Sequence, residues 1–155
     1  MTITFKAIKD AVKRHLSIIG KRMYSKDGKN MFSDITVSTA EDPIFDQYIV
    51  SGAQNVEALL RPLVEEFTLN SNTTIGVKLN NTRGSEDFDS HCTEFIKTYI
   101  TLYSVGEYLA MVHPELAEKY RLDAANSIQA LQMYAFYKNP PKQAGYSYNN
   151  VIGLV

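Results

Sequence analysis

The chain has 155 residues, enough for one domain with a hydrophobic core but not for two comfortable ones. Hydrophobic residues make up 45% of it and charged residues 21%, values typical of a globular protein, which excludes wholesale disorder. The net charge of −1 excludes a global field that would draw the whole molecule to nucleic acid or to a membrane.

Positive charge is concentrated at the start of the chain. Residues 1–30 contain eight Lys or Arg and two Asp, a local net charge of +6, so the remainder carries −7. A basic segment on an acidic body can bind phosphate or an acidic neighbour, but such lysines also commonly solvate the outer face of a helix. Both interpretations stay open at this point.

The first predicted element is an amphipathic helix of about four turns. Thr4 is a candidate N-cap, Gly20 a candidate end, and Lys6, Lys9, Lys13 and Arg14 share the polar face. The apolar residues recur at helical spacing: Phe5, Ile8, Val12, Leu16 and Ile19.

Residues 20–42 lack helical periodicity, and the β-branched stretch 35–39 predicts a short strand. Asp42 and Pro43 form a strong helix start, with Asp as the N-cap and Pro in the first turn. Apolar spacing predicts that this second helix runs to about Phe67. Because Pro62 removes one backbone hydrogen bond, we also expect a bend or an early stop near Leu59.

Residues 73–80 show the periodicity of a strand, since Ile75, Val77 and Leu79 alternate with smaller or polar residues. The expected partner of this strand is the 35–39 stretch, in the same chain or in a neighbouring subunit, because a lone exposed strand is a liability in a free monomer. We therefore predict that Ile75, Val77 and Leu79 lie at an interface.

Two long helices follow. Ser85 is a candidate cap for the first of them, and its apolar stripe runs from Phe88 to Val112. His113 ends this helix because the residue before a proline avoids the helical region, and Pro114 opens the next helix, which Asn139-Pro140-Pro141 stops.

Residues 139–155 form the last segment, which has one charge, several glycines or prolines and aliphatic residues near its end. It is too apolar for a solubilising tail and too Gly-rich for a helix. Tyrosine is favoured at interfaces, so we predict contact residues in this arm: Tyr146, Tyr148, Val151, Ile152 and Leu154. Tyr134 and Tyr137 either join them or finish the core of the preceding helix.

The predicted fold class is mainly α, with a four-helix domain at 1–138, a short β-ribbon within it and an extended C-terminal arm at 139–155. No apolar run reaches the roughly 18 residues of a membrane span, and charges from Lys6 to Arg14 leave no signal-peptide core. We expect a cytoplasmic protein with no membrane partner.

No catalytic, cofactor-binding or metal site is predicted. His91 and Glu94 share a helix face, but a bundle metal site needs Glu-x-x-His elements on two helices. The single cysteine, Cys92, excludes an internal disulfide and lies on an apolar stripe, where a thiol is usually a small buried hydrophobe. Neither a Gly-rich phosphate loop nor a Gly-x-Ser-x-Gly elbow occurs. We expect a protein that is not an enzyme and holds no cofactor.

The order of the predicted elements resembles that of the head–tail connector (adaptor) proteins of tailed bacteriophages. Residues 43–60 look like the early helix of that family, in which an acidic residue, a Tyr/Leu-Ile pair and small residues recur, and residues 123–131 look like its late helix. The resemblance covers residues 43–137. The longer 20–42 segment and the 139–155 arm depart from the family pattern.

The resemblance implies a structural protein of the virion neck, which forms a homo-oligomeric ring between the portal and the tail or neck proteins and binds no specific nucleic acid. In a ring, one surface of a subunit meets a different surface of the next copy. Strand 73–80 and the apolar stretch 146–155 suit such contacts, because an extended segment can add to a neighbour's sheet.

Two other classes stay open. A small helical-bundle enzyme or ligand-binding domain of unknown substrate would tolerate the loss of 139–155, whereas an assembly subunit would lose its partner. A helical regulator that contacts nucleic acid through the first helix would show binding that weakens steeply with salt.

Overall fold

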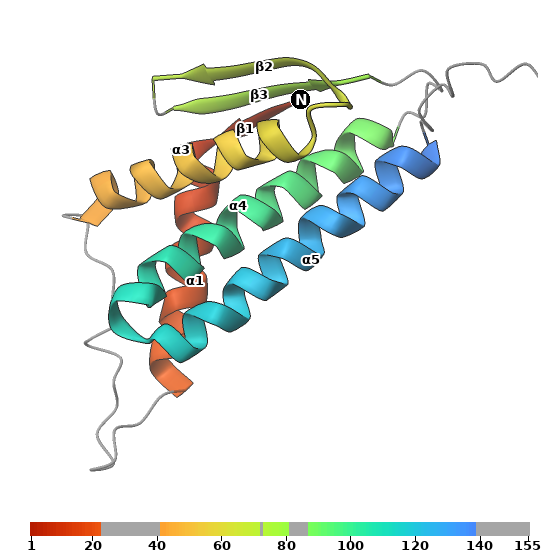
Figure 1. Cartoon of the computed structure of the whole chain (residues 1–155). Helices are drawn as coiled ribbons and strands as arrows, with labels where there is room; N and C mark the ends of the chain where they lie inside the picture. The colour runs from red at the N-terminus through yellow and green to blue at the C-terminus, as the bar shows by residue number, and fades with distance from the viewer. Residues whose placement is uncertain (23–40, 72, 81–86, 139–155) are drawn as a thin grey trace, which may run out of the picture.

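The computed structural model describes residues 1–22, 41–71, 73–80 and 87–138 (Figure 1). They form β1 (Thr2–Thr4), α1 (Phe5–Arg22), α3 (Asp42–Leu59), β2 (Val64–Asn70), β3 (Thr74–Leu79), α4 (Phe88–Val112) and α5 (Pro114–Lys138). The expected mainly helical fold with four helices and a small β element is confirmed. The predicted strand at 35–39, the Ser85 cap and the arm at 139–155 lie outside the described residues.

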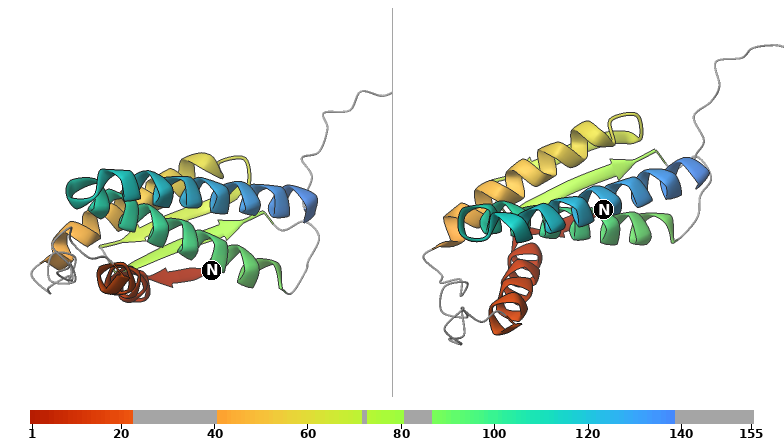
Figure 2. Two further views of the ribbon diagram at one scale, coloured as in Figure 1. Left: turned by 90° about the horizontal axis from the view of Figure 1, so that it is seen from below. Right: turned by 60° about the horizontal axis from the view of Figure 1, so that its bottom comes forward.

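The helices form a layer on one side of a small sheet. Helices α4 and α5 make an antiparallel hairpin, α3 runs along α4, and α1 crosses them steeply (Figures 1 and 2). The turn of the hairpin is a single residue, His113. Its N–H donates to the carbonyl of Leu109 at 2.6 Å, and its own carbonyl accepts from Leu116 and Ala117. The predicted break at His113-Pro114 is therefore confirmed.

The start of the chain adds a strand that the sequence did not predict. Thr2–Thr4 pairs with β3 as β1, and the chain then enters α1 directly. The Thr4 hydroxyl accepts a hydrogen bond from the N–H of Ala7 at 3.3 Å, which confirms the predicted cap. Three residues are too few to display strand periodicity, so only the pairing with β3 identifies β1.

Helix α3 ends shortly before Pro62, which has no backbone N–H to donate to a helix. The helix ends at Leu59, as expected from Pro62, and the N–H of Leu60 closes the last turn on the carbonyl of Val56 at 2.9 Å. The predicted continuation of a helix to Phe67 is wrong, because residues 64–70 form β2 and pair antiparallel with β3. A strand here gives the backbone the hydrogen-bond partners that a helix would otherwise supply.

The sheet has the order β1-β3-β2, so β3 is its central strand. Ile75, Val77 and Leu79 are 0%, 2% and 4% exposed and belong to the hydrophobic core. Both edges of β3 are paired within the chain. The prediction of these three residues as interface contacts is therefore corrected: they hold the sheet on the helices of their own chain.

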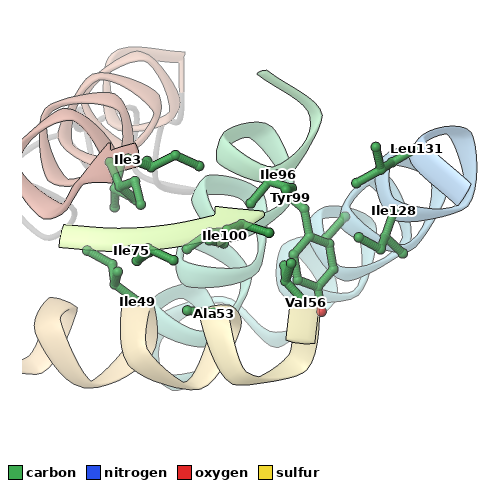
Figure 3. Close-up of a cluster of buried hydrophobic side chains, with 14 of the residues drawn as sticks. Ile3, Ile49, Ala53, Val56, Ile75, Ile96, Tyr99, Ile100, Ile128 and Leu131 are labelled. Atoms are coloured by element: carbon green, nitrogen blue, oxygen red, sulfur yellow. The ribbon is translucent and has the colours of Figure 1, made fainter. Parts of the chain in front are cut away.

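The core lies between the sheet and the helices. Figure 3 shows Ile3 of β1 and Ile75 of β3 facing side chains of α3 and α4, with Ile128 and Leu131 of α5 extending the cluster. Helices α3 and α4 approach closely at Gly52. A Cβ atom at that position would lie 3.1 Å from the Tyr103 ring and 3.2 Å from the Ile100 side chain, so the glycine permits this close packing.

Candidate interaction surfaces

Cys92 and His91, which have potentially reactive side chains, make structural contacts. Cys92 is fully buried, and its burial, assisted by the nearby Asp89 charge, raises the pKa of the thiol to about 12, so it stays protonated at neutral pH. His91 is exposed and its Nδ1 lies 2.8 Å from the carbonyl oxygen of Asp87. Within residues 1–22, 41–71, 73–80 and 87–138, no three His, Cys, Asp or Glu side chains are placed to hold a metal ion.

The tyrosines of α3 and α4 lie at contacts inside the chain. Across the α3–α4 contact, Tyr103 shares a 3.1 Å hydrogen bond with Ser51, and the hydroxyl of Tyr48 lies 3.7 Å from the sulfur of Met111. Burial raises the pKa of Tyr48 and of Tyr99, so both hydroxyls are neutral donors over the physiological range. Tyr48 and Tyr103 thus join α3 to α4.

Tyr134 belongs to an aromatic cluster that closes the far end of the α4–α5 hairpin. Its ring centroid lies 5.9 Å from that of Phe88, 5.6 Å from that of His91 and 6.3 Å from that of Phe95. Of the two interpretations left open for Tyr134, the core contact is the observed one. The side chain of Tyr137 and residues Tyr146 and Tyr148 lie outside the described part of the chain.

The basic face of α1 is partly neutralised by the first turns of α3. Lys9 contacts Asp46 at 2.9 Å and Lys13 contacts Asp42 at 2.6 Å, and these side chains are 20% to 34% exposed. The hydrogen bond from Lys13 lowers the pKa of Asp42, so the pair is ionised at neutral pH. Two of the basic residues thus hold α1 on α3. A charge reversal at both would damage the fold as well as any contact with a partner.

His15 lies where α1 meets the α4–α5 hairpin. Its ring contacts Tyr120 edge-on at a centroid distance of 6.2 Å. It also lines a depression of about 110 Å³ together with Ala11 of α1 and several residues of α4: Glu94, Lys97, Thr98, Thr101 and Leu102. Burial, with a smaller contribution from the Arg14 charge, lowers the pKa of His15 below its ordinary value of 6.5.

This lowered pKa sets a pH dependence of stability. As the pH falls below about 6.5, the unfolded chain binds a proton at His15 before the folded chain does, so the free energy of unfolding decreases towards acidic pH. We expect His15→Gln to make the decrease between pH 7 and pH 5 shallower than in the wild type. Urea titrations at several pH values in this window measure it, and parallel curves for the two proteins would contradict the assignment.

The outer edge of β2 is the first surface that the fold leaves open. Among the described residues, β2 pairs with β3 on one edge and with no strand on the other. Its inward residues Val64, Phe67 and Leu69 pack on the core but are only partly buried, in contrast to those of β3. Sequence reasoning missed this edge because the apolar spacing of 64–69 continued the helical pattern of α3.

The second open surface is the outer face of α5, which we call the α5 stripe: Leu122, Ala125, Asn126, Gln129, Ala130 and Met133. All six residues are exposed, with Leu122 at 62% and Met133 at 68%. Their spacing of three and four places them on one side of the helix, opposite the buried Ala117, Ala124 and Ile128. No residue from Ala124 to Tyr137 carries a charge. That uncharged run was visible in the sequence, but only the structure separates its exposed face from its buried one.

Comparisons of this chain with protein-family models, curated proteins and solved structures gave no match. None of the described helices combines the length and the apolar character that a membrane crossing demands. Among the described residues, the open edge of β2 and the α5 stripe are two surfaces that the fold leaves uncovered.

Proposed function

We propose that this chain is a structural assembly subunit that works by contacting other protein chains, as a ring-forming head–tail connector between the portal and the tail of a tailed phage. The observation that carries the proposal is the α5 stripe. A second support is the resemblance of residues 43–60 and 123–131 to helices of connector proteins, since 123–131 lies on α5 itself.

The residue composition of the α5 stripe is more typical of a surface that binds another protein than of one that faces water. A helix at the surface of a monomer usually presents charged residues on its outer face. The stripe instead presents two large apolar side chains among alanines and amides, with no charge between Asp123 and Lys138. Depletion of charge together with an exposed Met is typical of the buried centre of an interface.

The geometry suits a contact between unlike surfaces. The stripe lies on one side of the molecule, because α5 packs mainly against α4 and not against the sheet (Figure 2). A contact between the stripe and a different surface of the next copy is heterologous, and repeated heterologous contacts close into a ring when the rotation permits. The virion neck is the proposed location, with portal and tail or neck proteins on either side of the ring.

The test places one negative charge in the middle of the stripe. We expect Met133→Glu to weaken self-association at least about tenfold, because assembly would bury an unpaired carboxylate. The matched control Gln54→Glu adds the same charge at an exposed position of α3, outside the stripe, and leaves association unchanged. Native mass spectrometry and light scattering of the full chain over a range of concentrations give the readout, with circular dichroism to verify the fold.

Two outcomes would contradict the proposal. One is a wild-type chain that stays monomeric at high concentration, alone and mixed with portal or tail proteins. The other is an assembly that Met133→Glu leaves as tight as the wild type, since the stripe then takes no part in it.

A further inference from the structure

The outer edge of β2 has unused pairing capacity. It is seven residues long, and no described strand covers that edge. Such an edge presents a row of backbone N–H and C=O groups that can pair with any extended chain, which is why folded proteins usually protect edges of this length. Glu65 of β2 forms an ion pair with Lys78 of β3 at 3.1 Å, which partly neutralises this carboxylate within the sheet. A register shift between Val64 and Glu66 leaves residues 66–70 as the regular part of the edge.

The hydrophobic layer beneath the sheet is also incomplete at this edge. Val64, Phe67 and Leu69 contact the core but stay partly exposed, while Ile75, Val77 and Leu79 on the next strand are buried. A further strand beside β2 would bury the exposed parts of these three side chains. Among the described residues, this edge therefore has neither a pairing strand nor complete apolar cover.

Residues 146–155 have the composition of a strand that fits this edge. The stretch has ten residues and no charge. With a period of two, one side carries Tyr146, Tyr148, Asn150, Ile152 and Leu154, and the other carries Ser147, Asn149, Val151, Gly153 and Val155. The first side carries the larger side chains and can cover a core, while the second carries smaller ones and can meet water.

We propose that residues 146–155 of a neighbouring copy pair with the outer edge of β2 as a fourth strand, whose large face covers Val64, Phe67 and Leu69. The inference rests on the proposed function, since it requires that copies of the chain associate. It names the contact that passes from one subunit to the next, by addition of a strand to an open sheet edge.

The position of α5 favours a neighbouring copy over the same copy. The side chain of Gln132 donates to the carbonyl of Leu59 at 2.9 Å, so α5 ends beside the end of α3, a few residues before β2 begins at Val64. A strand that returned from there along the same copy would run parallel to β2. A strand from the next copy is free to run antiparallel, as both other pairings of this sheet do, and antiparallel pairing is the more stable per residue.

The test uses the two faces of the segment in the full-length chain. Ile152→Asp places a charge on the large face, and Asn149→Asp places the same charge on the small face. Oligomer mass by native mass spectrometry and amide hydrogen exchange of residues 64–70 are measured on each protein, above and below the concentration at which the wild type associates. We expect the amides of β2 to exchange at least about tenfold more slowly in the associated wild type than in the monomer. Ile152→Asp is expected to lose both that protection and the association, whereas Asn149→Asp keeps both.

The two readouts separate this inference from the proposed function. Association that survives Ile152→Asp, with β2 exchanging fast, would overturn the strand addition and leave the assembly role standing. Slow exchange, equal in monomers and in oligomers, of those β2 amides that do not bond to β3 would show pairing within one copy and would overturn the neighbour assignment. A wild type that neither associates nor protects β2 would overturn both.

Discussion

Replacement of Phe45 by alanine is expected to lower the free energy of unfolding by about 3–5 kcal/mol, the range for truncating a large buried aromatic side chain. Phe45 is fully buried on the first turn of α3. Its ring lies 5.3 Å from that of Tyr108 on α4 and 6.3 Å from that of Tyr48. Alanine would leave a cavity where α3 meets α4, and both tyrosines would lose a ring contact.

The neighbouring residue provides the control for Phe45. Ile44 is 38% exposed on the same turn, so Ile44→Ala removes an aliphatic side chain without opening a core cavity. Since small domains are stable by only about 5–15 kcal/mol, Phe45→Ala should shift the urea midpoint strongly or prevent folding altogether. Equal shifts for the two variants would show that Phe45 does not occupy the core position described.

Ile75→Ala is expected to lower the free energy of unfolding of the isolated monomer by about 2–5 kcal/mol. Ile75 is 0% exposed on the central strand, opposite Ile3 of β1 and Leu69 of β2. This variant separates the observed role from the one that the sequence predicted. An interface residue would weaken association and leave the monomer stable, whereas a core residue destabilises the monomer itself.

Thermal or urea unfolding at a concentration where the chain is monomeric measures the effect of Ile75→Ala. Lys78 lies on the same strand with its side chain 62% exposed and paired to Glu65, so Lys78→Ala is the matched control and should cost less than about 1 kcal/mol. If Ile75→Ala left the stability of the monomer unchanged, Ile75 would again be a candidate for an interface residue.

The helices were predictable because their signals are local. The apolar stripe of α4, the break at His113-Pro114 and the Thr4 cap each depend on residues within one or two turns. Proline marked the end of α3 for the same reason, since the loss of one N–H acts on the chain immediately around it. The positions of these elements and the mainly helical class follow from the sequence alone.

The sheet and the candidate surfaces depend on contacts between distant residues. Val64, Phe67 and Leu69 have a spacing that fits a helix as well as a strand, and only the pairing with β3 decides between them. The same pairing, with β1 on the other side, makes Ile75, Val77 and Leu79 core residues and leaves β2 as the open edge. Periodicity shows that one face of an element is apolar, but not which element covers it.

The helical class, the helix ends near prolines and the uncharged run from Ala124 to Tyr137 could be predicted without coordinates. Which side of that run is exposed depends on the packing of α5 against α4, so it required the fold. The fold also pairs Lys9 and Lys13 with acidic residues of α3, across a separation in sequence that no local pattern encodes. Local hydrogen bonds and periodicity depend on neighbouring residues, whereas sheet edges, exposed faces and long-range ion pairs arise when distant segments meet.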